Sequence, residues 1–222
     1  MCGRFDVHSA IDIIARIFQI DNVSIDLKPS YNVAPSQEIG IVINEGGRNL
    51  LIASRWGFLP FWAKEKQTAY SMINARAETV ASNRSYKDAF LNHRCLIPAD
   101  GFYEWLKQDK AKIPYYIHLK SHDPMGLAGL YNAWTSPEGE TIQTCTIITT
   151  DANSLLAPIH NRMPVILHAR DYKVWLKSDE HDATFLLPLL KPYPSDELAT
   201  YQVTPKVNSF KYNKPENIRP IS

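Results

Sequence analysis

The sequence has few cysteines, no long apolar run and almost no net charge, and each absence excludes a class of protein. Its three cysteines, Cys2, Cys95 and Cys145, form no CxxC pair, which argues against a disulfide framework or a structural zinc site and favours a reducing cytoplasm. No apolar run approaches a membrane span, and the N-terminus lacks the charged-then-apolar pattern of a signal peptide. The formal net charge is +1, so any nucleic-acid contact must come from a local patch.

Common catalytic motifs are also missing. The sequence contains no glycine-rich phosphate loop, no HExxH and no GxSxG, so nothing points to a nucleotide cofactor, a catalytic metal or a serine hydrolase. What remains is a chain of 222 residues, 45% hydrophobic and 21% charged, which can bury a substantial core. Without a repeat or a linker, residues 1–222 are expected to form one domain, and we expect no metal and no cofactor.

Alternating and periodic apolar residues predict an α+β domain with a mostly antiparallel, barrel-like sheet and short flanking helices. Strands are expected at 38–44, 48–54, 94–99, 100–105, 113–119, 126–134, 141–149 and 165–168, and helices at 9–19, 84–91, 170–177 and 184–190. Glu45-Gly46-Gly47 predicts a hairpin turn between the first two strands. Ser9 and Asp12 resemble a capping box. The tail of about 204–222 is expected to run along the surface.

Cys2 is the first residue along the chain whose groups could carry out a reaction. Methionine before a small residue is removed easily, and its removal leaves a free α-amine and a thiol on Cys2. Typical pKa values are about 7.7–8.0 for the amine and about 8.5 for the thiol, so both are partly nucleophilic near neutral pH. A 1,2-aminothiol attacks an aldehyde to give an imine and closes to a thiazolidine, or its thiol attacks an amide. Cys2 could equally be an ordinary residue of a frayed terminus.

Three polar positions lie among residues that look buried. Glu104 lies between Tyr103 and Trp105; a desolvated carboxyl there would have a raised pKa suited to acid–base work, whereas strand alternation equally allows it to face solvent. His160 precedes Arg162 in a loop, where most histidines are structural or solvated. Asn74, close to Arg76, could position a substrate or simply end a strand.

The segment 55–62 contains four aromatic residues, followed by lysines. Trp56 and Phe58 are expected to plug the core, and Trp62 is the candidate for stacking against a nucleic-acid base. Cys95 and Cys145 lie in apolar strands, so both are expected to be buried, unreactive thiols.

Taken together, these motifs resemble the SOS response-associated peptidase (SRAP) family. The resemblance rests on motifs that occur in one order from Cys2 to Pro164: Cys2-Gly3-Arg4-Phe5, Tyr31-Asn32-Val33-Ala34-Pro35, Arg55-Trp56-Gly57, Asn74-Ala75-Arg76-Ala77-Glu78-Thr79, Asp100-Gly101-Phe102-Tyr103-Glu104-Trp105 and His160-Asn161-Arg162-Met163-Pro164. A looser match continues to about Val203. The chain lacks the tail of eukaryotic members, so it is expected to be a bacterial protein.

This resemblance implies that the chain recognises abasic sites in single-stranded DNA and links to them covalently through Cys2. The aldehyde of the ring-opened sugar is the electrophile that an aminothiol traps, and closure to a thiazolidine removes the imine that would otherwise promote strand cleavage. The family name records a peptidase activity, which would be self-removal of Met1. We therefore expect a monomeric DNA-repair protein with hydrolase or lyase-like chemistry. We expect it in the cytoplasm, at the nucleoid, with no membrane partner.

The resemblance also assigns roles to individual residues. It implies that Cys2, Asn74, Glu104 and His160 are catalytic, with Asn74 positioning the substrate, Glu104 transferring protons and His160 helping to open the sugar. It implies DNA contacts for Gly3, Arg4, Trp62, Arg76, Thr149 and Arg162. Contacts to the DNA backbone fix the position of the protein along the strand without reading the base sequence.

Two other functions stay open. An N-terminal-nucleophile amidotransferase also begins Cys-Gly after processing, and its cysteine attacks a glutamine amide. A non-catalytic single-strand binding module would use the arginines and aromatics, with Cys2 incidental. Glutaminase activity would identify the first. Salt-sensitive, reversible binding that survives Cys2→Ala would identify the second.

Overall fold

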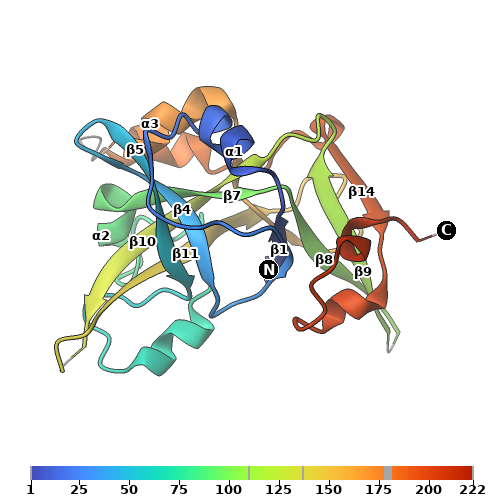
Figure 1. The fold of residues 1–222 in the computed structure, drawn as a ribbon, viewed down its shortest axis with the longest axis horizontal. Helices are drawn as coiled ribbons and strands as arrows, with labels where there is room; N and C mark the ends of the chain where they lie inside the picture. The colour runs from blue at the N-terminus through green and yellow to red at the C-terminus, as the bar shows by residue number, and fades with distance from the viewer. Residues whose placement is uncertain (1, 110, 137, 178–181, 222) are drawn as a thin grey trace.

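Two β-sheets make up most of the protein (Figure 1). The computed structural model describes residues 2–109, 111–136, 138–177 and 182–221. The larger sheet contains β2 (Asn22–Val23), β4 (Glu38–Glu45), β5 (Arg48–Trp56), β6 (Asn74–Arg76), β7 (Arg94–Ala99), β10 (Met125–Thr135), β11 (Thr141–Asp151), β12 (Arg162–Pro164) and β13 (Ile166–Leu167). The smaller sheet has the order β14 (Leu198–Gln202), β9 (Ala111–Leu119), β8 (Gly101–Gln108), β1 (Phe5–Val7), β3 (Ser30–Val33).

The larger sheet closes into a barrel. Antiparallel pairs link β11 to β10, β10 to β7, β7 to β4 and β4 to β5. A parallel pairing of β5 with β11, which sets Trp56 beside Cys145, joins the two ends of this path. Closure joins β5, at one end of this path, to β11 at the other. The predicted α+β class with a mostly antiparallel, barrel-like sheet is confirmed.

Local sequence explains the best-predicted parts of this barrel. Gly46 and Gly47 have φ values of 57° and 80° and connect β4 to β5, because a two-residue hairpin turn of this kind needs positive φ at both positions. The apolar run of β7 is buried at every residue, as its lack of alternation predicted. Trp56, Phe58, Cys95 and Cys145 are also fully or almost fully buried, as predicted.

The α-helices are shorter than predicted. They span α1 (Ile11–Ile17), α2 (Lys87–Asn92), α3 (Tyr172–Leu176) and α4 (Ala183–Leu186). However, 3-10 turns at Ala169–Asp171 and Leu187–Leu189 extend α3 and α4 to nearly the predicted spans. The capping box assigned to Ser9 and Asp12 is wrong: the N-cap of α1 is Ala10, with no side-chain cap. The Ser9 hydroxyl instead donates to Asp100, since a buried carboxylate at the start of β8 competes for it. Strand β1 was not predicted.

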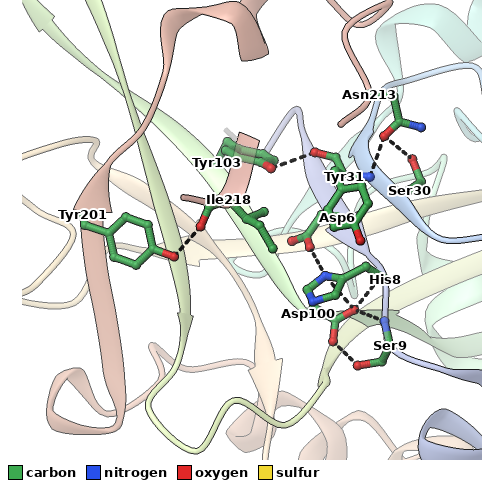
Figure 2. A network of polar contacts seen from close by, with 10 residues as sticks. All are labelled: Asp6, His8, Ser9, Ser30, Tyr31, Asp100, Tyr103, Tyr201, Asn213 and Ile218. Carbon is green, nitrogen blue, oxygen red and sulfur yellow. Dashed lines mark hydrogen bonds and ion pairs between the residues drawn. The ribbon is translucent and has the colours of Figure 1, made fainter. Parts of the chain in front are cut away.

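Asp100 holds the segment between β1 and α1 in place (Figure 2). Its carboxylate accepts the backbone N–H groups of His8 and Ser9 and the Ser9 hydroxyl. His8 in turn bonds through Nδ1 to Asp6, at 2.6 Å, and stacks on Tyr31. These contacts anchor the strand whose N-terminal extension carries Cys2.

We expect Asp100→Ala to lower the free energy of unfolding by about 2 kcal/mol, because two backbone donors and a hydroxyl lose their acceptor. For a domain of this size that corresponds to a fall of about 4–8 °C in Tm. Thermal denaturation measures it, with the exposed Asp123→Ala as the control. Equal melting temperatures for the two variants would contradict the anchoring role.

The C-terminal tail lies over the smaller sheet (Figure 1). Most of residues 204–221 are exposed, but Val207 and Asn217 are fully buried. Val207 packs with Tyr103 and Tyr116, and Asn32 donates to the carbonyls of Val207, Ser209 and Tyr212. Among the described residues, no helix is long and apolar enough to cross a membrane.

Candidate active site

Cys2 lies at the junction of the two sheets, where β1 approaches β8. The antiparallel pair Phe5–Phe102 and the hydrogen bond from Tyr103 N–H to the Arg4 carbonyl carry the N-terminal segment toward Glu104. The Cys2 side chain is fully buried. Burial, followed by the nearby charge of Glu104, raises the pKa of the Cys2 thiol well above its usual value. The thiol is therefore protonated at neutral pH until a base removes its proton.

Asn74 reaches Cys2 from the other sheet. It is positioned by the parallel pairing of β6 with β11, opposite Ile147, and its Nδ2 donates to the Cys2 carbonyl oxygen at 2.9 Å. Its Oδ1 is buried and accepts no hydrogen bond from the described residues. A buried acceptor without a donor is costly in a folded protein, so this oxygen is suited to receive a donor from a bound molecule or from the processed N-terminus.

Glu104 lies on β8, opposite Tyr115 of β9, and is 3% exposed. The buried alternative considered for this residue is therefore correct, and the solvent-facing one is wrong. Burial raises the pKa of Glu104 to about 7, although the hydrogen bond with the Trp105 backbone acts in the opposite direction. A carboxyl that is half protonated near neutral pH can both accept and donate a proton, which is the requirement for acid–base catalysis.

His160 follows a tight turn after β11. Its Nδ1 lies 3.0 Å from the backbone nitrogen of Arg162 and 3.3 Å from the Arg162 carbonyl oxygen, so the backbone of Arg162 holds the ring in place. Burial lowers the pKa of His160. The neutral imidazole is thereby favoured.

Two open pockets meet at His160. One, of about 550 Å³, is lined by Glu104, Trp105, Lys107, Lys112, His160 and Asn208. The other, of about 510 Å³, is lined by Arg76, Glu78, Thr79, Asp151, His160, Asn161 and Arg162. We call them the lysine pocket and the arginine pocket. An extended ligand that crosses His160 can occupy both.

Arg4 connects the N-terminal segment to the tail. Its Nη1 donates to Asn32 Oδ1 at 2.7 Å and to the Val207 carbonyl at 2.9 Å, and its guanidinium lies 6.0 Å from the Trp105 ring. Burial lowers the pKa of Arg4, yet an arginine remains charged. Gly3, between Cys2 and Arg4, is half-buried.

The other predicted DNA contacts differ in accessibility. Arg76 is exposed and lines the arginine pocket. Arg162 lines it too, but its guanidinium bonds to Glu78 and Asp151, each at 2.7 Å, and to the Thr149 carbonyl. Thr149 is 1% exposed and its hydroxyl donates to the Ala75 carbonyl. The phosphate contact expected of Thr149 does not fit this geometry, because the buried hydroxyl is already used.

Trp62 lies outside both pockets. Its side chain is exposed, with the Arg84 guanidinium 5.4 Å from the ring, and its neighbour Phe61 is 70% exposed. The stacking role predicted for Trp62 remains a prediction. The residues that sequence reasoning missed are Trp105, Lys107, Lys112 and Asn208, although the alternation of β8 places Lys107 on the same side as Trp105.

One group of side chains among the described residues has metal-like spacing, namely Asp6, His8 and Asp100. Burial raises the pKa of Asp6 to about 6, and the hydrogen bond to Asp6 raises the pKa of His8. The His8–Asp6 contact of 2.6 Å has the length of a charge-assisted hydrogen bond. Asp100 is already occupied by its three donors. Asp6 Oδ1 is buried and has no hydrogen-bond partner among the described residues.

The chain is similar to proteins named for abasic-site processing. It is 49% identical to the "Abasic site processing protein YoqW" of Bacillus subtilis over 98% of this chain and 99% of that protein. It is 31% identical to the HMCES protein of Gallus gallus, which carries the same description, over 87% of this chain and 67% of that protein. A crystal structure of a protein from Bacteroides thetaiotaomicron superposes with a TM-score of 0.88 at 29% identity, and each chain is covered completely.

The model of one protein family, described as SOS response associated peptidase (SRAP), matches residues 1–210. That match includes Cys2, Asn74, Glu104 and His160, which the fold brings to one place from the N-terminal segment, β6, β8 and the loop after β11. The expected resemblance is thus confirmed over almost the whole chain, which belongs to the SRAP family.

Proposed function

We propose that this protein processes abasic sites in single-stranded DNA by linking Cys2 covalently to the ring-opened sugar. One observation carries the proposal: the backbone of Cys2 is held by Asn74 beside Glu104, a buried carboxyl whose pKa of about 7 suits proton transfer. The names of the relatives support the substrate. All the assigned residues come from one chain, so a monomer would suffice.

The reaction would begin at the α-amine of Cys2, once Met1 has been removed. The amine attacks the aldehyde carbon of the open sugar, and loss of one water gives an imine. The loss of water leaves the imine protonated, and the Cys2 sulfur adds to its carbon as the thiol gives up its proton. The product is a five-membered thiazolidine, and one water is released overall. Because the thiol is buried and protonated, the amine is the first nucleophile.

The surrounding side chains would transfer protons and hold the reacting groups in place. Protonated Glu104 donates a proton to the departing hydroxyl of the carbinolamine, which leaves as water. The ionised carboxylate then accepts the thiol proton as the sulfur adds, which restores the acid. His160, whose neutral form burial favours, donates a hydrogen bond to a sugar oxygen and so favours the open aldehyde. Asn74 Oδ1, the buried acceptor, receives a hydrogen bond from the Cys2 amine and orients it.

The test is a covalent-adduct assay with an oligonucleotide that carries one abasic site. We expect a heat-stable band on a denaturing gel, with an intact mass equal to protein without Met1 plus oligonucleotide minus one water. An undamaged oligonucleotide of the same sequence should give no band. If a chain shown by mass to begin at Cys2 forms no adduct, the proposal is wrong. Salt-sensitive, reversible DNA binding would then support a non-catalytic binding module. Glutamine hydrolysis would support an amidotransferase.

Removal of Met1 is the hydrolase reaction that the family name suggests for this chain. Hydrolysis of the peptide bond before Cys2 consumes one water and frees the α-amine on which the adduct depends. Intact masses of purified wild type and of Glu104→Gln show whether that step needs the same carboxyl.

A further inference from the structure

Two lysines lie directly opposite each other on neighbouring strands. Lys107 of β8 pairs with Lys112 of β9 in an antiparallel ladder, and both side chains are exposed. Among the described carboxylates, none forms an ion pair with either lysine. Like charges directly across a strand pair repel each other. An arrangement that costs stability in the free protein is explained if an anion binds between the two ammonium groups.

These lysines face a rigid part of the active site. Both line the lysine pocket together with Glu104 and His160. The Trp105 indole N–H, also in the lining of this pocket, donates to Asn208 Oδ1 at 2.7 Å and thereby ties β8 to the C-terminal tail. An anion held by the lysines would therefore lie at a set place relative to His160.

The balance of charge differs between the two pockets. In the arginine pocket, Arg162 is neutralised by Glu78 and Asp151, so two cations face two anions. In the lysine pocket, two cations face a single carboxyl, Glu104, which burial keeps partly protonated at neutral pH. The uncompensated positive charge beside His160 is therefore on the lysine side. A phosphate is attracted more strongly there than to Arg162.

We propose that Lys107 and Lys112 form a phosphate subsite for the DNA strand, on the side of the abasic nucleotide opposite Arg76 and Arg162. The proposal rests on the proposed function and adds positioning residues to it. A strand clamped on both sides of His160 presents its abasic sugar to Cys2 with little freedom to turn away. The charge of Lys107 has a second effect, since it is one of the influences that lower the pKa of His160.

The test is binding of the double variant Lys107→Ala/Lys112→Ala to single-stranded DNA, measured by fluorescence anisotropy at several salt concentrations. The matched control is Lys173→Ala/Lys191→Ala, which removes the same charge from exposed positions at α3 and beyond α4. Each phosphate contact contributes about 0.7 to the slope of log K against log salt for single strands. For the one phosphate held between the two lysines, we expect the slope to fall by about 0.7 and the affinity at 0.1 M salt to fall about fivefold.

A second measurement locates the phosphate. Oligonucleotides that carry one neutral methylphosphonate linkage, moved stepwise along both sides of the abasic site, are compared on wild type and on the double variant. We expect one linkage whose neutralisation weakens wild type but has little further effect on the double variant. That non-additivity would link the lysines to that phosphate.

The outcomes separate this inference from the proposed function. If wild type forms the adduct but the double variant matches its control in slope and affinity, the subsite is wrong and the proposed function stands. Additive losses at every linkage would also overturn the subsite. If wild type forms no adduct, the proposed function fails, whatever the lysines bind.

Discussion

Cys2→Ala, once processed to a free α-amine at its second residue, is expected to form no heat-stable adduct and instead to cleave the strand at the abasic site. The alanine amine can still form the imine with the sugar aldehyde, but no thiol is present to close the ring. An imine next to the C2′ hydrogens of the sugar makes β-elimination of the 3′ phosphate easier. The variant therefore changes the product from a shielded strand to a broken one.

Three readouts on one labelled oligonucleotide measure this change. The denaturing gel reports adduct and cleaved strand together, and borohydride reduction captures the imine as a stable amine. We expect adduct only for wild type, and cleavage with borohydride-dependent capture for Cys2→Ala. Asn74→Ala is a useful comparison, because it removes the hydrogen bond to the Cys2 carbonyl and leaves the aminothiol intact. A heat-stable adduct with Cys2→Ala, without borohydride, would exclude the thiazolidine.

Glu104→Gln is expected to stabilise the fold at pH 8 by about 3 kcal/mol while slowing adduct formation at least tenfold. Burial raises the pKa of Glu104 to about 7 in the folded protein, against about 4.3 in an unfolded chain. Between these values the folded state binds more protons, so wild-type stability falls as pH rises through that window. The neutral amide of Gln at position 104 avoids this loss of stability. It cannot donate or accept the protons of the reaction, so adduct formation slows.

Denaturant unfolding of wild type and Glu104→Gln at pH 5 and pH 8 measures the effect. At pH 5 the carboxyl is largely protonated in the folded state, so we expect the two proteins to differ by less than about 1 kcal/mol. The difference should grow between pH 5 and pH 8. A constant difference at both values would mean that Glu104 is not a buried carboxyl with a raised pKa.

Structural features that depend on neighbouring residues were predicted correctly from the sequence. The pair Gly46-Gly47 specifies a tight hairpin because both residues take positive φ. The continuous apolar run of β7 requires burial on both faces. The motifs around Cys2, Asn74, Glu104 and His160 identified the family, since they combine residue types with order along the chain.

Other features depend on partners far away in the chain. The Ser9 hydroxyl looked like a helix cap, but a carboxylate more than ninety residues later, Asp100, takes it. Strand β1 has three residues, too few for periodicity, and exists because β3 and β8 flank it.

The class of the fold, the hairpin at Gly46-Gly47, the family and the residues that could react were predictable from the sequence, because they follow from local propensity and from the order of motifs. The closure of the barrel through β5 and β11, the burial of Glu104 and the neutralisation of Arg162 by Glu78 and Asp151 depend on the folded chain. The fold also places Lys107 and Lys112 beside His160. Burial and pairing between distant segments set these charges and pKa values, and no local pattern encodes them.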